Sequence, residues 1–154
     1  MGQTARILVV DDDENIRKVL ATILEDEGYN VDLVDTAKKA IEKTKRNFYN
    51  IALIDVRLPD MEGIELLTKV KETMPKMRKI IITGYPTLQN AIEAVNKGAD
   101  AYIVKPFDME KALKTINEQL KMQEEEAKYS QERVAEFIET RVRELNVEKE
   151  ATHK

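Results

Sequence analysis

The chain has 154 residues, of which 42% are hydrophobic and 35% charged, and its formal net charge is -4. This length allows one hydrophobic core with an appendage, and the net negative charge argues against direct nucleic-acid binding by this chain. The absence of cysteine excludes disulfides, thiolate zinc sites and cysteine nucleophiles. The only histidine, His153, is the penultimate residue, so a histidine-based catalytic triad is not expected.

No segment has the character of a membrane span or of a secretion signal. Apolar runs such as residues 7–10 and 80–82 are far too short to cross a bilayer. The sequence does not open with a charged segment followed by an apolar one. We therefore expect a cytoplasmic protein that does not enter a membrane.

The first half of the chain alternates short apolar runs with amphipathic stretches. Residues 7–10 form a continuous apolar run, as a strand buried on both faces would, and residues 16–24 carry apolar side chains at helical spacing. Residues 31–34 predict a second strand and residues 37–41 a second helix. A third strand over residues 51–54 leads directly into an aspartate.

The alternation continues to the end of the expected core. Apolar residues at helical spacing predict a third helix over residues 64–70, and residues 80–82 predict a fourth strand. Ala91, Ile92 and Val95 indicate a fourth helix. A fifth strand over 101–104 and a last helix that begins after Asp108 complete the series. Strands that alternate with helices predict an α/β fold whose parallel sheet is covered on both faces.

The composition changes at residue 122. Residues 122–154 contain no glycine or proline and carry nine acidic and six basic residues, which indicates a charged helical extension of the last core helix. Leu113, Leu120, Ala127 and Val134 lie seven residues apart, a spacing that would suit a coiled-coil dimerisation arm. Gln123, Ala127 and Ser130 offer little to bury, so an unpaired tail remains the alternative.

Polar side chains follow four of the five expected strands. Asp11 and Asp12 follow the first strand, Asp55 the third, Thr83 the fourth and Lys105 the fifth. Ligands of an open parallel sheet bind outside the carboxyl ends of its strands. These carboxylates, the hydroxyl and the amine are therefore expected to lie together at one edge of the sheet.

Four segments together resemble the receiver domain of two-component response regulators, in particular the chemotaxis-regulator type. They are VVDDD, LIDVRLPDMEG, IIITG and AYIVKPF, in this order and each at a strand end. The resemblance extends from about Arg6 to about Leu120. It implies a five-stranded, flavodoxin-like, doubly wound (βα)5 receiver domain over residues 1–121, followed by the helical extension over 122–154.

The resemblance also implies the chemistry of the site. Asp55 would be the nucleophile that accepts a phosphoryl group from a histidine kinase. Asp12 and Asp55 would bind Mg²⁺ directly, together with the backbone carbonyl of Arg57, and Asp11 would act through a water molecule. Such an all-oxygen set suits this hard cation. The protein would thus be a phosphoacceptor signalling domain and no enzyme with a separate substrate.

Further residues would stabilise the phosphoryl group and respond to it. Lys105 would pair with a phosphoryl oxygen, and Pro106 would follow it through a cis peptide bond. Thr83 would donate its hydroxyl to another phosphoryl oxygen and let Tyr102 move inward. This exchange would switch the surface formed by the fourth helix, fifth strand and fifth helix.

Several residues leave room for other interpretations. Asp13 is expected to act as a helix-start acid and Asp60 to shape the turn before Gly63, rather than to bind metal. The family usually has alanine or serine where this chain has Gly84, so this loop is expected to be looser. Arg57 and Tyr85, two residues after Asp55 and Thr83, occupy positions that shape water access in this family. Both side chains are bulky, which predicts a long-lived phosphoryl group.

Two rival functions and two possible outputs follow from the sequence. A related phosphatase with an aspartate nucleophile needs a second acid two residues later, where this chain has Arg57. A scaffold without the chemistry would not need Asp11, Asp12, Asp55, Thr83 and Lys105 together. The output is either a stand-alone regulator or a receiver fragment of a larger transcriptional activator, whose receivers the segment GYPTLQNAIEAVNKGADAYIVKP resembles.

Overall fold

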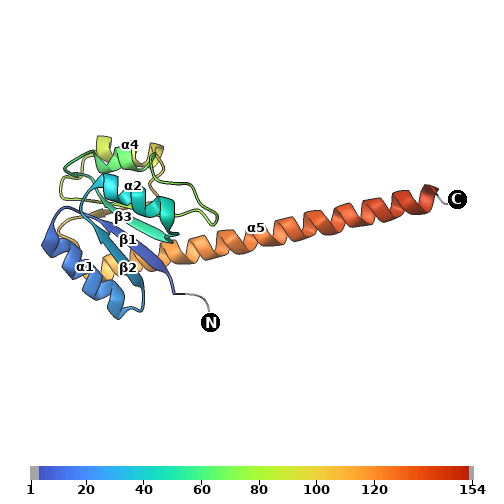
Figure 1. The fold of residues 1–154 in the computed structure, drawn as a ribbon, viewed down its shortest axis with the longest axis horizontal. Helices are drawn as coiled ribbons and strands as arrows, with labels where there is room; N and C mark the ends of the chain where they lie inside the picture. The colour runs from blue at the N-terminus through green and yellow to red at the C-terminus, as the bar shows by residue number, and fades with distance from the viewer. Residues whose placement is uncertain (1–3, 153–154) are drawn as a thin grey trace. The chain divides into compact units, whose positions relative to one another are not determined.

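The computed structural model describes residues 4–152, and their side chains as far as residue 147. Five parallel strands form one sheet in the order β2-β1-β3-β4-β5. Figure 1 shows β2, β1 and β3 side by side. The strands are β1 (Arg6–Val10), β2 (Asn30–Val34), β3 (Ile51–Asp55), β4 (Arg78–Thr83) and β5 (Ala101–Val104). The predicted doubly wound parallel sheet is thereby confirmed.

Helices connect the strands and cover both faces of the sheet (Figure 1). They are α1 (Glu14–Asp26), α2 (Ala37–Arg46), α3 (Gly63–Leu66), α4 (Leu88–Asn96) and α5 (Met109–Thr152). Along β1, Ile7 and Val9 face the cluster that includes Ala112 of α5, whereas Leu8 and Val10 face the opposite cluster. Because successive side chains of a strand point to opposite faces, one buried strand serves two hydrophobic cores.

The third helix is shorter than predicted. The sequence predicts a helix over residues 64–70, but α3 ends at Leu66. The amides of residues 67–69 bond to the carbonyl three positions earlier, with the Lys69 amide donating to the Leu66 carbonyl at 2.9 Å. Leu67 and Val70 are nevertheless buried. The apolar spacing thus marks buried positions correctly, while the backbone uses the tighter turns that are common at helix ends.

The fourth helix is present, but its apolar stripe does not face the core. Ile92 and Val95 are 52% and 68% exposed, whereas Ala94 is completely buried. Because alanine has a short side chain, contact through Ala94 lets the helix backbone lie close to the sheet. The apolar residues that identify α4 in the sequence are therefore at the surface.

The chain consists of two compact units, of which the first ends at Gln123 and the second begins at Glu124. The second unit is helical to residue 152 and its side chains are exposed over residues 128–147. Within it, ion pairs join Arg143 to Glu139 at 2.8 Å and Arg141 to Glu144 at 3.0 Å. Among residues 4–152, no helix combines the length and apolar character that a membrane span requires.

Candidate functional site

The acidic residues that follow β1 and β3 meet at the carboxyl edge of the sheet. Asp11, Asp12 and Asp55 each place a carboxylate oxygen within 4.8 Å of the others. Asp11 and Asp55 are 1% and 8% exposed, whereas Asp12 is exposed. Three neighbouring carboxylates repel one another strongly where burial removes water, so this edge favours a cation.

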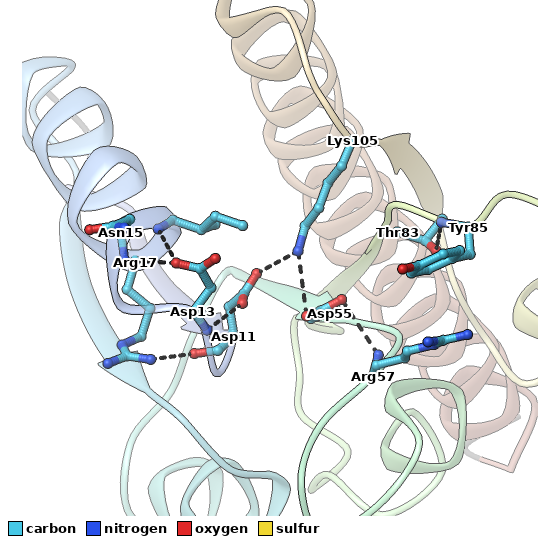
Figure 2. A network of polar contacts seen from close by, with 10 residues as sticks. Asp11, Asp13, Asn15, Arg17, Asp55, Arg57, Thr83, Tyr85 and Lys105 are labelled. Carbon is cyan, nitrogen blue, oxygen red and sulfur yellow. Dashed lines mark hydrogen bonds and ion pairs between the residues drawn. The ribbon is translucent and has the colours of Figure 1, made fainter.

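Lys105 supplies one positive charge to this cluster from the end of β5 (Figure 2). Its Nζ lies 3.0 Å from Asp11 Oδ2 and 3.4 Å from Asp55 Oδ2. Burial by itself lowers the pKa of Lys105, but its hydrogen bonds and the charges of both aspartates outweigh this effect and raise the pKa. The ammonium is therefore held in its charged form beside the two buried carboxylates.

The charge of Asp55 is only partly compensated. Burial raises the pKa of Asp55 to about 6, and the charge of Asp11 adds to this effect. Lys105 and the Arg57 amide, whose nitrogen lies 3.4 Å from Asp55 Oδ1, act in the opposite direction. The ammonium group of Lys105 thus neutralises only part of the nearby negative charge. The remaining negative charge favours an additional hard cation bound by oxygen ligands.

The loop after β1 holds Asp11 through its backbone and its side chain. The Asp13 amide donates to Asp11 Oδ1 at 2.9 Å, and Arg17 Nη1 donates to the Asp11 carbonyl at 2.7 Å (Figure 2). The Asp13 carboxylate accepts from the amides of Asn15 and Ile16 at the start of α1. Asp13 is therefore the acid at the helix start that the sequence predicted, and the structure makes it the N-cap of α1. The contribution of Arg17 was missed, because nothing local in the sequence distinguishes it from a solvated arginine.

Asp60 has a role beyond the predicted one. It was expected to shape the turn before Gly63, and its two oxygens also accept from the amides of Ala37 at 2.9 Å and Lys38 at 2.8 Å. These bonds lower the pKa of Asp60. Asp60 thus joins the loop after β3 to the start of α2, where unpaired amides favour a carboxylate. The partner lies more than 20 residues away, so the local turn pattern did not reveal it.

Gly63 fixes the loop that leaves Asp55. Its amide donates to the Val56 carbonyl at 2.6 Å, and a Cβ atom at this position would lie 1.9 Å from the Asp55 carbonyl oxygen. Only glycine permits this approach. The chain therefore folds back tightly beneath the nucleophile candidate, and Arg57 and Glu62 pair across the loop as an isolated bridge.

Thr83 and Tyr102 lie on β4 and β5. Thr83 is buried, its Oγ1 accepts from the Tyr85 amide at 3.0 Å, and its carbonyl accepts from the Lys105 amide at 2.7 Å. The Tyr102 side chain packs against the core cluster on the α4 side of the sheet, and its hydroxyl is buried without a hydrogen-bond partner among the described residues. The peptide bond between Lys105 and Pro106 is cis, as the resemblance implied.

Arg57 and Tyr85 stack at the side of the site. The guanidinium carbon of Arg57 lies 4.1 Å from the centroid of the Tyr85 ring, which is a favourable cation–π distance. Figure 2 shows this pair beside Asp55, opposite the group formed by Asp11 and Lys105. The two bulky residues therefore contact each other at the rim instead of standing apart.

A five-stranded doubly wound sheet with buried carboxylates and a lysine at its carboxyl edge is the arrangement expected of the receiver domains that the sequence resembles. Residues 7–117 match the family described as response regulator receiver domain, and the chain belongs to this family. The transcriptional regulatory protein ZraR of Klebsiella oxytoca is 36% identical over 119 residues, which cover 77% of this chain and 27% of ZraR. The response regulator ArlR of Staphylococcus saprophyticus is 35% identical over 118 residues, which cover 77% of this chain and 53% of ArlR.

Solved structures agree with this assignment. A CheY-like receiver domain protein from Methanospirillum hungatei JF-1 has a TM-score of 0.77 and 47% identity, covering 80% of this chain and 99% of that protein. The beryllofluoride-activated receiver domain dimer of NtrC4 has a TM-score of 0.72 and 38% identity, covering 77% of this chain and 98% of that one. The chain thus spans nearly whole receiver domains, but only about a quarter of ZraR and about half of ArlR.

Proposed function

We propose that this receiver accepts a phosphoryl group on Asp55 and that a histidine kinase is the donor. The observation that carries the proposal is the position of Asp55, buried at the carboxyl edge beside Asp11, with Lys105 paired to both carboxylates. An Asp55 carboxylate oxygen would attack the phosphorus of the kinase phosphohistidine, and the bond to the imidazole nitrogen would break with its electrons returning to the imidazole. The chain is thereby a signalling domain that takes part in its own phosphorylation.

Mg²⁺ is the proposed cofactor, because the donors at this edge are oxygens with excess negative charge. Asp12, Asp55 and the backbone carbonyl of Arg57 would hold it, with Asp11 acting through a water molecule. When bound, the ion neutralises charge that would otherwise repel the incoming phosphoryl group. Lys105, already charged and 3.4 Å from Asp55 Oδ2, would move from the carboxylates to a phosphoryl oxygen.

The proposed switch depends on Thr83 and Tyr102. Thr83 Oγ1 would release the Tyr85 amide and donate its hydrogen to a phosphoryl oxygen, and Tyr102 would respond by changing its position on β5. The surface formed by α4, β5 and the first turns of α5 would change as a result. Ile92, Val95 and Val104, all exposed, give this surface an apolar character.

The wider role is proposed by analogy with the relatives. ZraR is a transcriptional regulatory protein of which this chain matches one part, so we propose that the receiver controls a transcriptional activator in the cytoplasm. The receiver would not contact nucleic acid itself. A stand-alone regulator that acts through a partner protein is the second candidate, since the CheY-like protein is matched over nearly its whole length. The helical extension from residue 122 would pair with a second copy of the chain.

The phosphoacceptor is tested by phosphotransfer from acetyl phosphate in Mg²⁺, followed by intact mass. The wild type should gain one phosphoryl group and Asp55→Asn none, while Asp26→Asn, a matched change at an exposed position, should label normally. Labelling of Asp55→Asn at the wild-type rate would show that another residue is the acceptor.

The switch is tested with beryllium fluoride, which mimics the phosphoryl group. The Tyr102 resonances in nuclear magnetic resonance spectra should shift in the wild type and shift much less in Thr83→Ala. Equal shifts in both proteins would contradict the proposed coupling of Thr83 to Tyr102.

A further inference from the structure

A buried amide marks the end of the compact domain on α5. The Gln123 side chain is 4% exposed and continues the inner face of the helix, after Ala112, Ile116 and Gln119. From the sequence, Gln123 was expected to offer little to bury. Since a buried amide is unfavourable unless it is hydrogen-bonded, its partners explain its position.

Gln123 uses both ends of its amide group. Nε2 donates to the Lys76 carbonyl at 2.7 Å and to the Asn50 carbonyl at 3.0 Å. Oε1 accepts from Asn50 Nδ2 at 3.0 Å. Gln123 and Asn50 therefore bond reciprocally, and Lys76 adds a third bond from the loop before β4.

Asn50 connects this pair to the amino ends of three strands. Its Oδ1 accepts from the Arg6 amide at 2.9 Å, where β1 begins. Its carbonyl accepts from the Arg78 amide at 2.9 Å, where β4 begins, and Asn50 itself immediately precedes β3. A displacement of Gln123 would thus disturb bonds at the edge of the sheet opposite to Asp55.

We propose that Gln123 and Asn50 form a polar latch that fixes the axial position and rotation of α5 at the point where the compact domain ends. Apolar contacts such as those of Ile116 tolerate sliding and rotation, because they are not directional. The three hydrogen bonds of Gln123 do not tolerate sliding or rotation of the helix, because any shift leaves buried polar atoms without partners. The latch stops α5 from fraying back into the domain at the point where its contact with the sheet ends.

The two ends of the α5 segment that packs on the sheet are held differently. At its start, Asp108, three residues after Lys105, caps the helix locally, because its Oδ1 accepts from the Glu110 amide. At the other end, Gln123 bonds to Asn50 and to the Lys76 carbonyl, which lie outside the helix. The latch therefore joins this end of the helix to the amino edge of the sheet.

Hydrogen exchange of the full chain, followed by mass spectrometry, tests the latch. Gln123→Ala should speed the exchange of amides in residues 119–130 at least about tenfold, because losing buried hydrogen bonds shifts a local opening equilibrium by that factor or more. Gln131→Ala is the matched control, since Gln131 is an exposed glutamine of the same helix. Alanine favours helix formation at both positions, so equal exchange in the two variants would overturn the proposal.

A change outside the helix separates the latch from helix propensity. Asn50→Asp keeps the acceptor for the Arg6 amide but loses the donor to Gln123 Oε1, so it should also speed exchange in residues 119–130. Asn96→Asp, at an exposed position of α4, should not. Exchange of the amides of α2, which Asn50 does not contact through a hydrogen bond, serves as the internal reference for general destabilisation. If residues 119–130 keep wild-type exchange relative to α2 in Asn50→Asp, the latch is refuted.

The latch goes beyond the proposed phosphoacceptor role and can fail independently of it. Gln123 and Asn50 lie at the amino edge of the sheet, so labelling of Gln123→Ala by acetyl phosphate should equal that of the wild type. Loss of labelling in this variant would show that the amide supports the site itself, which would contradict its assignment as a latch for α5.

Discussion

Replacing Asp55 by asparagine should stabilise the protein when divalent cations are removed. Burial and the charge of Asp11 raise the pKa of Asp55 to about 6 from the ordinary value of 3.8. The folded state therefore holds a proton on this carboxyl more tightly than the unfolded state does. The penalty for ionising Asp55 is absent below the unfolded pKa, grows as the pH rises, and is complete above the folded pKa.

The size of this penalty follows from the pKa shift. At about 1.4 kcal/mol per pKa unit, a rise of about two units corresponds to about 3 kcal/mol of stability lost at pH 7.5. Asparagine keeps the size of the side chain but carries no charge, and it leaves Lys105 paired with Asp11 at 3.0 Å. The free energy of unfolding of Asp55→Asn should therefore exceed that of the wild type by up to about 3 kcal/mol at pH 7.5 and by almost nothing near pH 4.

Urea unfolding in EDTA at pH 4, 5, 6 and 7.5 measures this gain, with Asp26→Asn as the control for a simple loss of one negative charge. The difference between Asp55→Asn and the wild type should increase through the pH range between 4 and 6. Mg²⁺ at pH 7.5 should narrow it, because a bound cation stabilises the wild-type carboxylate. A variant that is no more stable than the wild type in EDTA at pH 7.5 would refute the electrostatic account of this site.

Three further outcomes are expected. Lys105→Ala leaves two buried carboxylates without their ammonium, so its free energy of unfolding in EDTA should fall by about 1–3 kcal/mol. Mg²⁺ should restore most of this stability, and a loss that persists in Mg²⁺ would contradict the expected charge compensation. Arg57→Ala and Tyr85→Ala should each shorten the lifetime of the phosphorylated protein several-fold, measured by mass over time, and an unchanged lifetime would remove their shielding role. Light scattering at tens of micromolar should show the full chain as a dimer and a chain ending at Gln123 as a monomer, a range in which an interface of about -6 kcal/mol is visible; two monomers would end the pairing hypothesis.

The sequence by itself determined the architecture and the composition of the carboxyl edge. Continuous apolar runs such as residues 7–10 identify strands buried on both faces, and their alternation with helices leaves a parallel sheet as the solution. Once the sheet is parallel, all carboxyl ends lie at one edge. The meeting of Asp11, Asp55 and Lys105 therefore follows from local patterns and one topological rule, although nearly 100 residues separate the first from the last.

Other features depended on partners that are remote in the sequence. Asp60 caps α2, which precedes it by more than 20 residues, although its own surroundings indicate a turn. Ile92 and Val95 have the spacing of a buried face, yet α4 contacts the sheet through Ala94. Apolar residues at helical spacing identify a helix, but they do not show which of its faces packs against the sheet.

Gln123 shows the same limit most clearly. The sequence predicts only that Gln123 offers little to bury in a helix pair, and only the fold brings it to Asn50 and the Lys76 carbonyl. A polar side chain can be buried where surrounding groups supply matching hydrogen-bond donors and acceptors. These groups come together only after distant strands have paired. The sequence thus determined which chemical groups the domain contains and that the charged ones meet at the carboxyl edge of the sheet. The tertiary structure decided which uncharged polar side chains are buried and which groups they bond to.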